Sequence, residues 1–172
     1  MFAQVINGII IQLIAAGSEF TYDGVTYPAN WITLATPEEL AQLGIVDVVY
    51  GSAPSDQYYW VSQDAPVYNE QTNQVDINFT ATPKDLASVQ STALNQVNSN
   101  AYSTLLPSDW MVVQQIENGT PVPADWGTWR QSVRNTTKTA VDAINAATNV
   151  DEVQTAVNNC VFLPDPNNPN QE

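Results

Sequence analysis

The spacing of the apolar residues changes within residues 75–93, which read VDINFTATPKDLASVQSTA. At the start of this stretch Val75, Ile77 and Phe79 alternate with polar residues, a spacing of two that is typical of a strand with one buried face. From Leu86 onward the apolar residues recur at steps of three and four, as on one side of a helix. The capping sequence Thr82-Pro83-Lys84-Asp85 separates the two patterns, and we place a boundary between residues 81 and 82.

Residues 1–81 are predicted to form a β-rich docking module built from antiparallel hairpins. Asn7-Gly8 and Asp23-Gly24 each lie between two apolar or β-branched runs, and such pairs favour type I′ hairpin turns. Thr36-Pro37-Glu38-Glu39 reads as a capping box, so we expect one short helix that ends at Gly44. We expect a short extended segment that starts at Trp31. A further antiparallel pair is expected between residues 58–61 and the alternation Val75, Ile77, Phe79, on either side of a polar turn at residues 70–73.

Residues 82–162 are predicted to form a three-helix module. The first helix has about five turns, the second starts near Pro123 or Asp125, and Asn149 caps the third, whose apolar side includes Val161. Residues 110–116 are expected to be a short helical or irregular piece. Residues 163–172 have no apolar side and are expected to be an irregular, extended Pro/Asn tail, held by a neighbouring chain. The predicted fold class is therefore α+β.

The charge balance excludes several kinds of partner. The chain has 172 residues with 4 Lys+Arg against 18 Asp+Glu, so its net charge is −14, and 44% of its residues are hydrophobic, enough for a core. Four cations cannot supply a nucleic-acid interface or bind an anionic membrane. The longest apolar run is far too short to span a bilayer and no basic segment precedes it, so we expect no membrane insertion, no signal peptide, and synthesis in the cytoplasm.

The amino acids that usually bind metals or act as general bases are scarce. The chain has no histidine and one cysteine, Cys160, which excludes Ser-His and Cys-His catalytic pairs and an intrachain disulfide. No glycine-rich phosphate loop occurs. We therefore expect no metal, no cofactor and no enzymatic activity, and we interpret Cys160 as a small core residue.

One pair of carboxylates and the aromatic residues near it allow a carbohydrate interpretation. Glu70 and Asp76 face each other across a predicted hairpin, and glycoside hydrolysis needs two carboxylates. A cluster of aromatic residues could stack on sugar rings, and its members are Tyr58, Tyr59, Trp60 and Tyr68. Solvated carboxylates and half-buried strand aromatics explain the same residues more simply, so carbohydrate binding ranks last among our hypotheses.

Three of the four cations lie on one helical stripe: Arg130, Arg134 and Lys138 are spaced at i, i+4 and i+8. Such a stripe could dock on an acidic protein surface, because arginine forms bidentate pairs with carboxylates. Alternatively, these residues pair within the chain with Asp125 or Asp142. The sequence favours neither interpretation.

Two motifs carry a resemblance to proteins of tailed bacteriophages. Ser108-Asp109-Trp110, followed later by Trp129-Arg130-Gln131-Ser132-Val133-Arg134, resembles a pattern of the phage tail assembly chaperone and tail-fibre-associated families, and Phe162-Leu163-Pro164-Asp165-Pro166 is similar to their ending. Residues 20–32 and 36–45 look like a small module of phage tail proteins. The resemblance assigns no catalytic residue.

The resemblance implies a structural component of a phage tail, located in the virion at the baseplate or at the fibre attachment. Such a protein would act by docking on other tail proteins, in three or six copies. The alternative is an assembly chaperone for the tail or its fibres, which is absent from the mature particle. The residues expected to contact partners are Arg130, Arg134, Lys138, Trp110, Tyr58 and Trp60.

Overall fold

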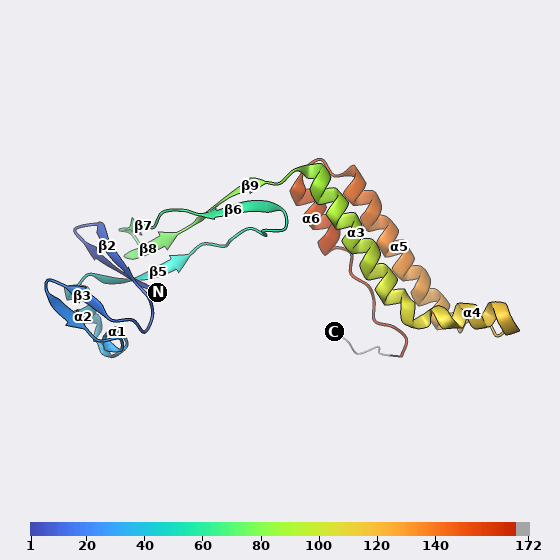
Figure 1. Cartoon of the computed structure of the whole chain (residues 1–172), viewed down its shortest axis with the longest axis horizontal. Coiled ribbons are helices and arrows are strands. Elements are labelled where there is room, and N and C mark those ends of the chain that lie inside the picture. The colour runs from blue at the N-terminus through green and yellow to red at the C-terminus, as the bar shows by residue number, and fades with distance from the viewer. Residues whose placement is uncertain (168–172) are drawn as a thin grey trace. The chain divides into compact units, whose positions relative to one another are not determined.

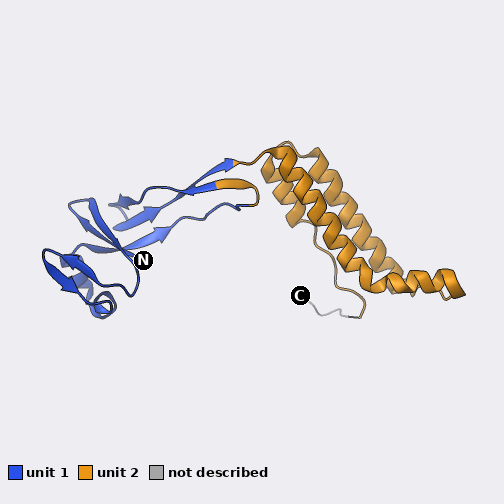
Figure 2. Cartoon of the chain, viewed as in Figure 1, with its two compact units in different colours: residues 1–56, 61–82 blue, residues 57–60, 83–172 orange. Residues whose placement is uncertain are grey.

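The computed structural model describes residues 1–167 and divides the chain into two compact units. The first unit comprises Met1–Asp56 and Val61–Thr82, and the second comprises Gln57–Trp60 and the chain from Pro83 onward (Figure 2). Strands dominate the first unit and helices the second, so the predicted α+β class is confirmed (Figure 1).

The main sheet of the first unit has five strands in the order β2-β1-β5-β8-β7. These strands are β1 (Phe2–Ile6), β2 (Ile9–Ile14), β5 (Ile45–Tyr50), β7 (Val67–Asn69) and β8 (Gln74–Ile77). Most of the pairs are antiparallel, but β5 and β8 run parallel, which the prediction of antiparallel hairpins alone missed. A long connection joins β5 to β8, and only a tight turn would have forced the two strands to run in opposite directions.

Both predicted hairpin turns are confirmed. Asn7 and Gly8, between β1 and β2, have φ angles of 51° and 78°. Asp23 and Gly24, between β3 (Phe20–Tyr22) and β4 (Val25–Tyr27), have φ angles of 48° and 75°. Positive φ at both central residues is what a type I′ turn requires.

Two short helices cover one face of the sheet, where a single one was expected. The second, α2 (Pro37–Gln42), has the predicted capping box, in which the Thr36 side chain and the Glu39 carboxylate each accept a hydrogen bond from the other residue's backbone N–H. The first, α1 (Trp31–Leu34), replaces the extended piece predicted at Trp31, and that prediction is wrong. Trp31 and Ile32 both pack into the same core cluster, whereas a strand would send adjacent side chains to opposite faces.

The strands β6 (Tyr59–Gln63) and β9 (Phe79–Pro83) form a separate two-stranded sheet. The predicted pairing of residues 58–61 with Val75 and Ile77 is wrong, because β8 pairs with β7 across the turn at residues 70–73. The Asp64 N–H donates to Asn78 O at one end of this sheet, and the Lys84 N–H donates to Tyr58 O at the other, so the two strands are antiparallel. Residues 57–60 belong to the second unit, where Tyr58 is buried among helical residues such as Val89.

As far as residue 167, the second unit contains four helices, in place of the predicted three. They are α3 (Leu86–Leu105), α4 (Asp109–Asn118), α5 (Ala124–Ala146) and α6 (Val150–Asn158), with a single 3₁₀ turn, η1 (Leu106–Ser108), between α3 and α4. The apolar sides of α3, α5 and α6 pack together as predicted, and α3 and α5 lie side by side (Figure 1). Residues 110–116, predicted as short helical or irregular, belong to α4, which ends at Gly119 in a left-handed conformation.

Two details of the predicted helix limits are wrong. The cap of α3 is Asp85, whose carboxylate accepts from the Ser88 N–H at 2.9 Å, because Thr82 and Pro83 still belong to β9. Val161 is exposed rather than part of an apolar side, because α6 has already ended at Asn158.

The start of the C-terminal segment contacts α5 of the same chain. Residues 163–167 form no helix or strand, as predicted, and residues 168–172 lie outside the described residues. Leu163 O accepts a 2.9 Å hydrogen bond from the Trp129 ring N–H, and Phe162 packs against the cluster that contains Trp129 and Val133. Within the described residues, α5 therefore contacts the start of this segment, and the expectation that a neighbouring chain holds residues 163–172 stays a prediction.

Candidate protein-docking site

An apolar surface is exposed on α4. None of the ten residues of this helix is buried, and the exposed fractions are 58% for Trp110, 50% for Val113 and 80% for Ile116. Their spacing of three residues places them on one side of the helix. We call these three residues the α4 surface. Tyr102 and Leu106, in the helical turns before α4, are also exposed.

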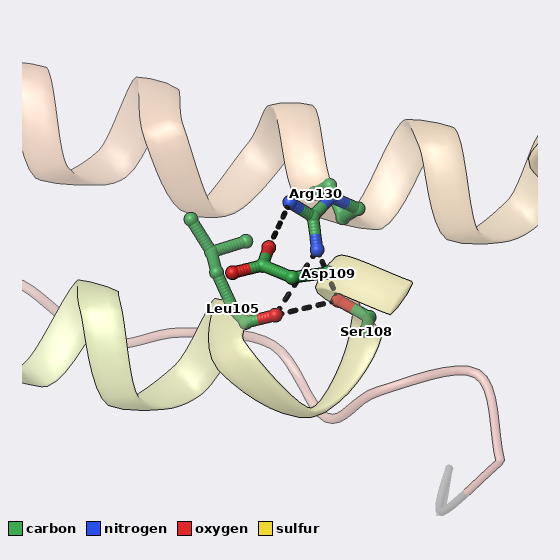
Figure 3. A network of polar contacts seen from close by, with 4 residues as sticks. All are labelled: Leu105, Ser108, Asp109 and Arg130. Atoms are coloured by element: carbon green, nitrogen blue, oxygen red, sulfur yellow. Dashed lines mark hydrogen bonds and ion pairs between the residues drawn. The ribbon is translucent and has the colours of Figure 1, made fainter. Parts of the chain in front are cut away.

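A polar network fixes the first turn of α4 (Figure 3). The Arg130 guanidinium, on α5, donates to Leu105 O at 3.0 Å and to the Ser108 hydroxyl, and forms an ion pair with Asp109 at 2.6 Å. Ser108 also donates to Leu105 O at 2.8 Å. Leu105 is the last residue of α3, so its carbonyl has no partner within that helix. Arg130 therefore joins the end of α3 and the start of α4 to α5.

The network brings together the two motifs that carried the family resemblance. Ser108 and Asp109 come from one motif and Arg130 from the other, and all three meet at the start of α4. The motifs thus have a structural explanation in this chain, because they fix the direction in which α4 leaves the helical unit.

Of the two interpretations of the basic stripe, intrachain pairing holds for Arg130 and Lys138, and the expectation that Arg130 contacts a partner is wrong. This side chain is only 5% exposed, because its guanidinium supplies the donors that Leu105, Ser108 and Asp109 need. Lys138 pairs with Asp142 at 2.5 Å, which is one of the two intrachain pairs considered from the sequence. Arg134 is exposed and forms no ion pair with any residue that the structure describes.

The aromatic residues predicted to contact partners have different environments. Tyr58 is 3% exposed and belongs to the core, and this burial raises the pKa of its hydroxyl. Trp60 is exposed, and Lys84 Nζ lies 4.6 Å from the centre of its ring. The neighbouring Tyr59 hydroxyl donates to the Asp151 carboxylate, and this hydrogen bond raises the pKa of Tyr59. Trp60 and Trp110 thus remain available to a partner, whereas Tyr58 does not.

The carboxylates considered for glycoside hydrolysis do not have the required environments. Asp76 accepts hydrogen bonds from the Asn69 and Gln74 side-chain amides, at 3.0 and 2.6 Å, and these bonds lower its pKa. Glu70 is exposed on the turn between β7 and β8. A glycosidase needs one carboxylic acid that stays protonated near neutral pH, and Asp76 is held in the ionised form.

Within residues 1–167, no group of three or more acidic, cysteine or histidine side chains is placed to hold a metal ion. Cys160 packs against the helical core, and its burial raises the pKa of the thiol. Among the described helices, none combines the length and the apolar character that crossing a membrane requires.

Val113, Ile116 and the network partners of Arg130 were missed from the sequence. The sequence did contain a signal for an apolar side of this helix, because Trp110, Val113 and Ile116 are three residues apart and the charged residue Glu117 follows them. The partners Leu105 and Ser108 carried no such signal, because their role depends on where α5 passes.

Comparison with known proteins adds no relative: no protein-family model, no curated protein and no solved structure matches the chain.

Proposed function

We propose that this chain is a non-enzymatic structural component of a bacteriophage tail, at the baseplate or fibre attachment, and that it docks on other tail proteins. The observation that carries this proposal is the α4 surface, with Trp110, Val113 and Ile116 exposed on a helix that buries none of its residues. Contiguous exposed apolar side chains typically mark a surface that another protein covers.

The placement of α4 supports a binding role. A helix that adds no buried residue to its own unit gains little stability from packing. Arg130 nevertheless holds its first turn through three internal partners. A surface held in one orientation loses less conformational entropy when a partner binds, which favours tight docking.

The first unit offers a second place for assembly. Strand β2 is at one edge of the five-stranded sheet, contains no charged residue, and exposes Ile9, Ile11 and Leu13. Edge strands of monomeric proteins usually carry charges or proline that prevent pairing. A strand of a neighbouring chain could extend the sheet here, in keeping with a homo-oligomer of three or six copies.

The tail context of the proposal rests on the resemblance of the Ser108-Asp109-Trp110 and Trp129-Arg130 motifs to phage tail families. The net charge of −14 supports protein partners rather than nucleic acid or an anionic membrane. In this proposal the chain is made in the host cytoplasm and resides in the virion tail.

An assembly chaperone is the second candidate. Its supporting observation is again that the α4 surface is open in the single chain, as expected of a protein that holds an apolar segment of a tail or fibre protein during assembly. Such a chaperone would leave before the particle is complete.

Quantitative mass spectrometry of gradient-purified particles tests the proposal. We expect a copy number, relative to the major tail protein, that is a constant multiple of about three. Abundance in the infected-cell lysate together with absence from particles would replace the structural role with the chaperone role. A Trp110→Ala variant that enters particles at the normal copy number would remove the α4 surface from either role.

A further inference from the structure

We infer that the α4 surface binds an amphipathic α-helix of a different protein, in which Lys or Arg flanks an apolar stripe. This inference rests on the docking role proposed above and specifies the chemistry of the partner. It rests on the charges of α4, on the hydrogen bonds of its backbone and on the net charge of the chain.

The charged residues of α4 are all acidic. The helix contains Asp109 in its first turn and Glu117 in its last turn, and no Lys or Arg. Asp109 is already paired with Arg130. Glu117 is exposed, lies at i+7 from Trp110, and therefore continues the line of the α4 surface. A cation on a partner bound to this surface would meet Glu117.

The position of Glu117 in the helix also points to a cationic partner. The last turn of a helix carries partial negative charge from its free carbonyl groups, so an acidic side chain there is unfavourable. The last turn of α4 contains no basic residue that offsets Glu117. A Lys or Arg of the partner would be attracted by both the carboxylate and the carbonyl groups.

The partner is expected to be a helix because α4 offers side chains rather than backbone. Away from its two ends, the backbone N–H groups and carbonyls of α4 are used within the helix, and Gly119 N–H donates to Gln115 O at 3.1 Å at its C-terminal end. Strand addition needs free backbone groups, whereas rows of side chains at three-residue spacing fit between those of another helix.

A second copy of this chain fits the surface poorly. Each copy carries a net charge of −14, and an α4–α4 contact would bring Glu117 of both copies to one interface, whereas the β2 edge proposed above for assembly carries no charged residue. A different, basic partner removes this repulsion. The charge argument therefore separates the helix of another protein from self-association.

The test measures binding of three fluorescent peptides to the full chain by anisotropy. The first is an amphipathic Leu/Ala/Lys helix of about 18 residues, or five turns. The second has the same sequence with every Lys replaced by Glu. The third is a scrambled sequence with the composition of the first, so that it keeps the charge and lacks the apolar stripe. We expect only the first to bind, at least about tenfold more tightly than the others.

Protein variants locate the binding site and measure how much the charge of Glu117 contributes to the affinity. Trp110→Ala should weaken binding of the cationic helix at least about tenfold. Glu117→Lys should weaken the cationic helix and strengthen the acidic one. Glu19→Lys is the matched control, since it makes the same change in net charge at an exposed loop residue of the first unit, and it should leave both affinities nearly unchanged.

Three results would overturn the inference. The first is that the scrambled peptide binds as tightly as the amphipathic cationic one. The second is that Glu117→Lys and Glu19→Lys change the peptide affinities equally. The third is concentration-dependent dimerisation in light scattering that Trp110→Ala abolishes, which would make a second copy the occupant. If none of the peptides binds while Trp110→Ala still prevents entry into particles, the docking role stands and the partner chemistry fails. If Trp110→Ala has no effect in either experiment, the proposed docking through the α4 surface fails as well.

Discussion

Asp109 and Arg130 are 21 positions apart in the chain and form an ion pair with 2.6 Å between Oδ1 and Nη2. Asp109 is the first residue of α4, whereas Arg130 is buried on α5. The pair therefore connects α4, which has no buried residue, to the packed part of the helical unit. Both the stability of this joint and the use of the surface can be tested separately.

Arg130→Ala should lower the free energy of unfolding of the helical unit by about 2–4 kcal/mol, because it leaves Leu105 O, Ser108 and Asp109 without their shared donor. Urea denaturation followed by circular dichroism at the helix band measures the change. Arg134→Ala removes the same charge from an exposed position of the same helix and should change stability by less than about 0.5 kcal/mol. Equal losses in the two variants would contradict the structural role of Arg130.

Ile116→Ala and Ile144→Ala form a matched pair that tests whether the α4 surface serves binding or folding. Ile144 is completely buried, so its truncation should cost about 2–5 kcal/mol. Ile116 is 80% exposed, and its truncation should cost less than about 0.5 kcal/mol. Thermal or urea denaturation measures both. A large loss at Ile116 would show that the side chain is covered within the chain itself.

Gly44→Ala should destabilise the first unit much more than Gly24→Ala. Both glycines have positive φ, at 65° and 75°, which costs an alanine about 1–2 kcal/mol. At Gly44 a Cβ would also lie 2.1 Å from Val5 O, whereas at Gly24 it would meet open space. We expect Gly24→Ala to fold with a loss near that cost, and Gly44→Ala to lose at least about twice as much in urea denaturation. Similar losses would mean that the sheet adjusts at Val5.

Trp129→Phe should release the C-terminal segment without unfolding α5. The substitution removes the ring N–H that donates to Leu163 O, a loss of about 1 kcal/mol, and keeps an aromatic side chain in the core. The heteronuclear ¹H–¹⁵N NOE of the Leu163 and Asp165 amides should fall, because the segment becomes mobile, while that of the interior of α5 stays high. Trp126→Phe is the control, because its ring N–H donates to no group within residues 1–167. An unchanged NOE in Trp129→Phe would mean that Phe162 alone holds the segment.

Glu152 makes the stability of the helical unit depend on pH. Hydrogen bonds from the Thr148 backbone and side chain hold the pKa of its carboxyl below the ordinary value of 4.5. Because the pKa is lower in the folded chain than in the unfolded one, the stabilisation is present above pH 4.5 and is lost as the pH falls below it. Glu152→Gln should flatten this part of the pH profile of the unfolding midpoint. An unchanged slope would assign the acid sensitivity to other carboxylates.

Local sequence signals predicted the elements that local energetics control. Asn7-Gly8 and Asp23-Gly24 formed their turns because few other residues adopt positive φ at both positions. Thr36 and Asn149 cap helices because their side-chain oxygens accept from backbone groups three residues ahead. The long apolar periodicity from Leu86 to Leu105 likewise left one helical solution.

The candidate site was predicted only in part. Trp110 and Trp60 are exposed as a partner-binding role requires, but Tyr58 is buried by residues of α3 that no spacing rule connects to it. Arg130, spaced like a surface residue, is buried because distant carbonyl, hydroxyl and carboxylate groups surround it.

The sequence by itself determined the turns at Asn7-Gly8 and Asp23-Gly24 and the caps at Thr36 and Asn149, because each depends on the φ preferences and hydrogen bonds of residues within one turn of each other. Only the tertiary structure decided the parallel pairing of β5 with β8, the burial of Arg130 and the open side of α4. These features depend on which groups far apart in the chain come into contact, and contact is what determines whether a charge is paired and whether an apolar side chain is covered.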